Sequence, residues 1–118
     1  MKPILRRLHS PDLLNMQDDM PDNVEQFGIL VQAFIGPSDG LGEESFDFVV
    51  CTLDFAASAL HQDGFLFGKH YLLVECYNYQ IIFDAIDSLC NKISGSNWQE
   101  IAETLGRYGK WEFEDYVD

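Results

Sequence analysis

Two pairs of carboxylates have the residue type and spacing best suited to acid–base chemistry. Glu43 and Glu44 are adjacent in a glycine-rich stretch, and Glu112 and Glu114 lie two residues apart near the end of the chain. A carboxyl group works as a general acid or base when burial or a close like charge raises its pKa. Loops and chain ends are open to solvent, which leaves carboxyl groups ionised at neutral pH. We therefore interpret these glutamates as solvated charges and expect no enzymatic activity.

The histidines and cysteines are too widely spaced to form a recognisable metal or nucleophile motif. They are His9, His61, His70, Cys51, Cys76 and Cys90. No two of them follow the spacing of a zinc site, and the cysteines lie in apolar patterns typical of small core residues. An odd number of cysteines argues against a disulfide framework and favours a reducing compartment. The chain also lacks a phosphate-binding glycine loop, so we expect neither a metal nor a cofactor.

The charge of the chain is strongly negative and unevenly distributed. Twenty Asp and Glu stand against seven Lys and Arg, a formal net charge of −13, and residues 10–68 hold eleven acidic residues and no Lys or Arg. Such a field repels the polyanions nucleic acid and anionic membrane, and it attracts basic surfaces. Solubility alone is the other explanation for this acidity. No apolar run is long enough to cross a bilayer and no signal-peptide pattern is present, so we expect a cytoplasmic protein.

Hydrophobic periodicity places these residues on predicted elements. Alternation predicts strands over 2–9, 27–35 and 45–51, another centred on 71–74, and a short one over 110–116. Helical spacing predicts helices from Thr52 to Gly64, over 79–93 and over 98–105. The turn-rich segment 36–42 predicts a long antiparallel hairpin. The result is an α+β fold, an antiparallel-rich sheet of about four to five strands packed with three helices, forming a single two-layer domain over residues 1–118.

The same patterns predict which side chains are buried. Phe46, Phe48 and Val50 share one strand face, and the first helix carries a stripe of Leu53, Ala56, Ala57 and Leu60. Near the end, Trp111 and Phe113 have two interpretations. Either they fill the core while the glutamates beside them face water, or they form an aromatic–acidic binding strip.

Three separated blocks of the sequence resemble one known family. They are "FGILVQAFIGPSDGLGEESFDFVVCT", "GKHYLLVE" and "NWQEIAETLGRYGKWEFEDY", and "LHSPDL" near the start fits as well. In order and spacing these resemble the immunity protein 8 family of bacterial polymorphic toxin systems. The chain departs from the family pattern at Leu53 and Phe55, where a proline and a tryptophan are expected. The resemblance implies a small cytoplasmic protein that neutralises a cognate toxin domain, often one delivered by contact-dependent growth inhibition, without catalytic residues of its own.

The acidic charge suggests what kind of toxin the partner is. A nuclease needs a basic surface for its substrate, and an acidic inhibitor complements that surface. We therefore expect a nuclease toxin domain, an RNase rather than a DNase. The candidate partner-binding residues are Asp39, Glu43, Glu44, Asp47, Glu112, Glu114 and Asp115. The alternatives are a small carboxylate-dependent enzyme and a chaperone or adaptor without a toxin.

Overall fold

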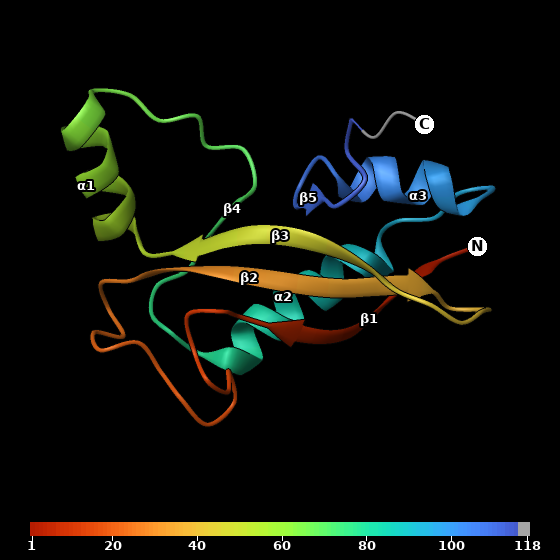
Figure 1. The fold of residues 1–118 in the computed structure, drawn as a ribbon, viewed down its shortest axis with the longest axis horizontal. Coiled ribbons are helices and arrows are strands. Elements are labelled where there is room, and N and C mark those ends of the chain that lie inside the picture. The colour runs from red at the N-terminus through yellow and green to blue at the C-terminus, as the bar shows by residue number, and fades with distance from the viewer. Residues whose placement is uncertain (116–118) are drawn as a thin grey trace.

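Alternating apolar residues build a five-stranded mixed sheet in the computed structural model, which describes residues 1–115 (Figure 1). The strands are β1 (Pro3–His9), β2 (Gly28–Pro37), β3 (Glu44–Cys51), β4 (Tyr71–Leu73) and β5 (Lys110–Trp111). Their order is β1-β2-β3-β4, with β5 paired to β3 beyond the end of β4. The β3–β4 pairing is parallel and the others are antiparallel. The predicted β2–β3 hairpin is confirmed, and β2 lies between β1 and β3.

Two of the three helices cover one face of the sheet. The helices are α1 (Leu53–Asp63), α2 (Tyr79–Asn91) and α3 (Trp98–Leu105). In Figure 1, α2 lies behind the sheet, and its Ile82 and Ile86 share one core with Phe46 of β3 and Ile101 of α3. Asn78 caps α2 by accepting a hydrogen bond from the Ile81 amide at 3.1 Å. The predicted α+β fold with three helices is confirmed.

The predicted burial of α1 is wrong. This helix has no buried residue, and Leu53 is 69% exposed. The helix projects from the end of β3, at the left of Figure 1, where no other helix or strand of the described residues covers it. Its attachment is local: the Phe27 amide donates to the Thr52 hydroxyl at 3.2 Å, and the Phe55 ring lies against the Gly28 backbone.

The predicted strand over 110–116 is shorter than its alternating pattern suggests. Pairing ends after Trp111, and the Glu114 amide then donates to the Trp111 carbonyl at 3.0 Å, which closes a turn. Asp115 has a φ of 64°, a conformation incompatible with an extended strand. Trp111 is 8% exposed and joins the core, whereas Phe113 is 39% exposed, so the core interpretation holds for Trp111 alone. The end of the predicted strand, Tyr116, falls outside the described residues.

Candidate partner-binding site

The seven candidate carboxylates come from the β2–β3 turn, β3 and the segment that follows β5. Pairing of β3 with β5 brings the two ends of this set together. The Glu112 amide donates to the Ser45 carbonyl at 3.1 Å, and the Ser45 amide donates to Glu112 Oε1 at 2.8 Å. Glu112 therefore lies beside Ser45, from which 67 residues separate it in sequence.

Glu44 lies at the edge of the aromatic part of the core. Its Oε1 accepts hydrogen bonds from the indole Nε1 of Trp98 at 2.7 Å and of Trp111 at 2.8 Å. Glu44 pairs with the fully buried Ile35, so its side chain is on the helix-covered face of the sheet. The sequence-based interpretation of Glu44 as a solvated loop charge is wrong. Glu44 is half-buried, and its carboxylate accepts hydrogen bonds from one indole on α3 and one on β5.

Both tryptophans are held by aromatic contacts. Trp111 stacks on Phe46 with ring centroids 6.4 Å apart, and Trp98 meets the same ring edge-on at 6.5 Å. Phe113 packs edge-on against Trp111 at 5.9 Å. These contacts fix the direction in which the two indole N–H groups point, and so fix the carboxylate that they share.

Two shallow cavities flank Glu44 and Trp98, which line both of them. One, of about 270 Å³, is completed by the β2–β3 turn, including Leu41 and Glu43. The other, of about 240 Å³, is completed by Gln99, Trp111 and Phe113. Neither cavity has a Lys, Arg or His among its lining residues. This part of the molecule therefore presents aromatic and acidic groups to the surface.

Glu43 and the turn that carries it are held by two arginines of β1. Arg7 pairs with Glu43 Oε1 through Nη2 at 2.8 Å and Nε at 3.0 Å, and its guanidinium lies 3.8 Å from the centroid of the Phe34 ring. Arg6 donates to the carbonyls of Pro37, Gly40 and Gly42. The β2–β3 turn is therefore anchored to the edge strand and does not stand free.

Asp47 lies on the opposite face of the sheet from Glu44 and is near the charge of Glu112. It pairs with Gln32, on the face of the sheet opposite to Phe46, and its Oδ1 is buried without a hydrogen bond among the described residues. Burial raises the pKa of the Asp47 carboxyl, while the Gln32 side chain and the Lys110 charge act in the opposite direction. A carboxylate in this position is a poor candidate for direct contact with a partner at the turn.

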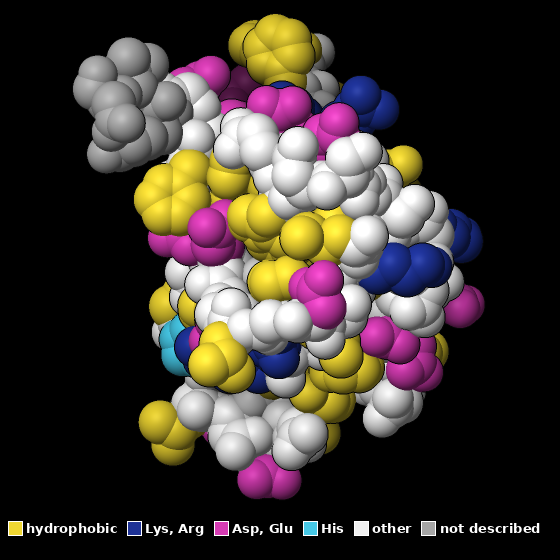
Figure 2. All heavy atoms as spheres, turned by 90° about the vertical axis from the view of Figure 1, so that its right-hand side faces the viewer, with side chains coloured by type: hydrophobic (Ala, Val, Ile, Leu, Met, Phe, Trp, Pro, Cys, Tyr) yellow, Lys and Arg dark blue, Asp and Glu magenta, His cyan; other side chains and the backbone are white. Residues whose placement is uncertain are grey.

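The remaining three carboxylates differ in exposure. Asp39 is exposed in the β2–β3 turn, and Asp115 is exposed after β5. Glu114 is half-buried beside Gly106. The end of the molecule that carries the turn faces the viewer in Figure 2, where Asp and Glu side chains are scattered among hydrophobic and polar ones. The acidic residues do not form one continuous patch there.

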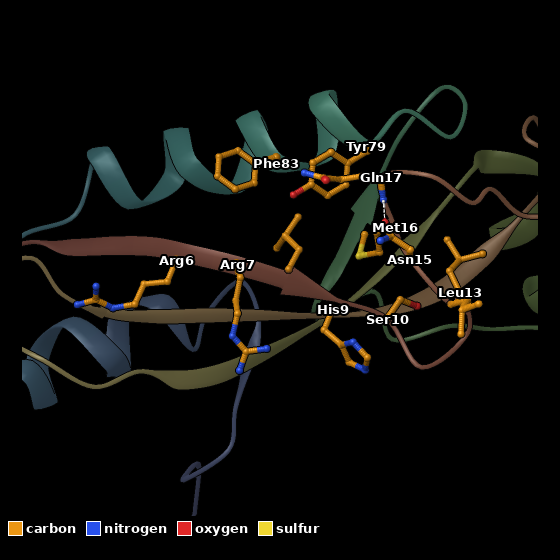
Figure 3. Close-up of a pocket in the computed structure, with 12 residues that line it drawn as sticks. Arg6, Arg7, His9, Ser10, Leu13, Asn15, Met16, Gln17, Tyr79 and Phe83 are labelled. Carbon is orange, nitrogen blue, oxygen red and sulfur yellow. Dashed lines mark hydrogen bonds between the residues drawn. The ribbon is translucent and has the colours of Figure 1, made fainter.

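The cavity drawn in Figure 3 does not bring catalytic groups together. It measures about 490 Å³ and lies between β1, the following loop and α2. Arg7 and His9 point away from Tyr79 and Phe83 of α2 (Figure 3), and the Arg7 guanidinium is already paired with Glu43. Within residues 1–115, no group of three His, Cys, Asp or Glu side chains could hold a metal ion. In the same range, no helix is long and apolar enough to cross a membrane.

An exposed apolar surface, not predicted from the sequence, lies at the end of the molecule opposite to the β2–β3 turn. Phe65 and Phe67, in the loop after α1, are 62% and 83% exposed and pack edge-on with centroids 5.8 Å apart. The signal was present in the sequence, because both phenylalanines lie between Gly64 and Gly68 in a segment without strand or helix periodicity. Exposed aromatic residues in such a loop are candidates for a contact surface.

Comparison with known proteins identifies the family. No curated protein and no solved structure matches the chain. A family model described as Immunity protein 8 matches residues 4–116 of the 118 residues, which confirms the resemblance carried by the three sequence blocks. The chain therefore belongs to the immunity protein 8 family, and this membership implies a cognate toxin as its partner.

Proposed function

We propose that this immunity protein acts in the cytoplasm by binding a nuclease toxin domain, an RNase rather than a DNase, in a stoichiometric complex. Family membership supports a toxin partner. The uncompensated charge supports a basic one: the chain carries 20 acidic against 7 basic residues, and the described part contains one ion pair, Arg7–Glu43. Within the described residues, most carboxylates are therefore not neutralised by an ion pair.

The basic surface of a nuclease toxin would complement the negative charge of this protein. A protein that binds RNA or DNA neutralises phosphates with Lys and Arg, and these groups repel one another when the substrate is absent. An acidic inhibitor relieves this repulsion and excludes the polyanionic substrate from the same surface. The toxin reaches the cell through contact-dependent growth inhibition in this proposal, and the immunity protein meets it after entry.

Purified components test the proposal. The toxin-like domain encoded by the adjacent upstream gene is mixed with this chain, and the product is measured by size-exclusion chromatography with light scattering. RNA and DNA degradation are followed in parallel. We expect a one-to-one complex and loss of RNA cleavage. A complex that forms while neither nucleic acid is a substrate of the free toxin would refute the nuclease assignment, and the absence of any complex would refute the binding mechanism.

The salt dependence of association tests the role of the charge separately. The Debye length falls from about 30 Å at 0.01 M salt to about 8 Å at 0.15 M. Long-range steering therefore weakens over this range, whereas close contacts in the complex are poorly screened. We expect the association rate to fall steeply and the dissociation rate to change much less. A flat association rate would mean that the acidity serves solubility, and the nuclease assignment would then lose its support.

A further inference from the structure

The Glu44 carboxylate is oriented by the fold while one of its oxygens stays available. Both indole N–H groups donate to Oε1, and no hydrogen bond to Oε2 is found within residues 1–115. The donors are themselves held by Phe46, so the carboxylate loses little further freedom when a ligand binds Oε2. A rigid anion with a free oxygen is a preorganised acceptor for a cationic donor.

The walls beside Glu44 suit the same kind of ligand. The cavity of about 240 Å³ has Trp98, Trp111 and Phe113 around the carboxylate. Aromatic rings attract a cation through their negative faces, and tryptophan does so most strongly. Cavities that take whole small molecules measure about 300–1,000 Å³. The size of this cavity therefore suits the end of one side chain rather than a free metabolite.

The local charge selects a cation. No basic residue is among the residues that line the two cavities at Glu44. Of their two carboxylates, Glu43 is paired with Arg7, so Glu44 carries the charge that no ion pair within residues 1–115 compensates. Three of the seven Lys and Arg residues line a different cavity, between β4, α2 and the end of α3; they are Lys69, Lys92 and Arg107. An anion would be repelled at Glu44, and a second copy of this chain would bring its own charge of −13 towards the first.

We propose that Glu44 and the rings of Trp98, Trp111 and Phe113 form a receptor for one arginine or lysine side chain of the toxin. This inference rests on the proposed function and adds the contact at its centre. The guanidinium or ammonium group donates to Glu44 Oε2 and lies against the aromatic walls. Such a partly desolvated, aromatic-lined contact has the composition of an interface hot spot.

The test must separate this role from the structural one, in which Glu44 only satisfies the two indoles. Glu44→Gln keeps the side-chain shape and an oxygen that accepts from both N–H groups, but removes the charge. Phe113→Leu keeps an apolar side chain and removes the ring. The matched control is Asp63→Asn, which removes one exposed charge near α1 at the other end of the molecule. Phe67→Leu removes one exposed ring at that end and tests the competing contact surface at Phe65 and Phe67.

Affinity for the toxin domain is measured for the wild type and the four variants at one salt concentration, together with the thermal midpoint of each. We expect Glu44→Gln and Phe113→Leu each to weaken binding about tenfold or more, mainly through faster dissociation. Asp63→Asn should change affinity less than about threefold, since an isolated exposed charge contributes little. Phe67→Leu should also stay within about threefold when the toxin binds at Glu44 rather than at the α1 end. The double variant should lose less than the product of the two single effects, because both act on one cation.

A spectroscopic readout detects occupancy directly. The chain has two tryptophans, and both line the site, so protein labelled with 5-fluorotryptophan should give two ¹⁹F signals that shift when unlabelled toxin is added. If the ¹⁹F signals do not shift, or if Glu44→Gln binds with wild-type affinity, the proposed receptor at Glu44 is wrong. A stable complex with the wild-type protein would still support the immunity function in that case. Weakening by Phe67→Leu but not by Glu44→Gln would place the toxin at the α1 end instead. Absence of a wild-type complex would instead reject the proposed function itself.

Discussion

Replacing Glu44 by alanine should destabilise the protein far more than the same change at the adjacent Glu43. Glu44→Ala removes the shared acceptor of two indole N–H groups, one of which belongs to the buried Trp111. A hydrogen bond to a charged group contributes about 1.5–3 kcal/mol, and a buried donor left without a partner costs about 1–3 kcal/mol. Trp98 is half-buried, so water can replace its lost partner. We therefore expect a loss of about 2–3 kcal/mol in the free energy of unfolding.

Glu43→Ala is the matched control, because it removes the same side chain one residue away. Glu43 makes an ion pair with the exposed side chain of Arg7, and pairs of this kind contribute about 0–1 kcal/mol. A domain of this length loses about 4 °C of thermal midpoint for each kcal/mol. The expected shifts are therefore about 8–12 °C for Glu44→Ala and less than about 4 °C for Glu43→Ala.

Urea unfolding followed by tryptophan fluorescence measures the difference, with far-UV circular dichroism as a second probe of the same transition. Coincident transitions would justify a two-state treatment. Glu44→Gln should retain most of the stability because its amide oxygen still accepts from the indoles. Equal losses at positions 43 and 44, or a Glu44→Ala variant as stable as the wild type, would refute the role assigned to the indole contacts.

Three further predictions follow from buried and crowded groups. Burial raises the pKa of the Asp47 carboxyl in the folded protein. The stability that this group contributes is therefore complete below the unfolded carboxyl pKa of about 3.9 and is lost as pH rises through the folded pKa. The Asp47→Asn variant should have a higher thermal midpoint than the wild type at pH 7 but not at pH 3. Burial raises the thiol pKa of Cys51, and that of Cys90 to about 12, so a disulfide reagent at pH 8 should modify the half-buried Cys76 first and all three cysteines only in urea. A side chain at Gly36 would clash with the backbone of the following turn, so Gly36→Ala should cost about 1–3 kcal/mol in urea unfolding.

The parts of the fold that local patterns specify were predictable. The strict alternation through β2 and β3 predicts their buried faces, since period two places Phe46 and Phe48 on one side of a sheet. The stripe on α2 and the Asn78 cap likewise predict that helix and its start. In these elements the local sequence alone is enough to predict which side is buried.

Features that depend on distant partners were not predictable in this way. The pattern on α1 is amphipathic, but burial also requires another element to cover its apolar stripe, and among residues 1–115 none buries it. Glu44 stands in a glycine-rich stretch that suggests solvent exposure, yet its partners Trp98 and Trp111 lie 54 and 67 residues away. The alternation after Trp111 predicts a longer strand, which the turn at Glu114 and Asp115 interrupts. Contact of the seven candidate carboxylates with a toxin stays a prediction.

Titration of toxin activity with this protein tests whether it inhibits the toxin by stoichiometric binding. A fixed concentration of toxin domain, well above the dissociation constant, receives increasing amounts of the protein, and the rate of RNA cleavage is measured after equilibration. Inhibition by binding predicts that activity falls linearly and reaches zero at one equivalent, independently of incubation time. Complete inactivation by far less than one equivalent, progressing with time, would contradict this account and show that the protein inactivates the toxin catalytically.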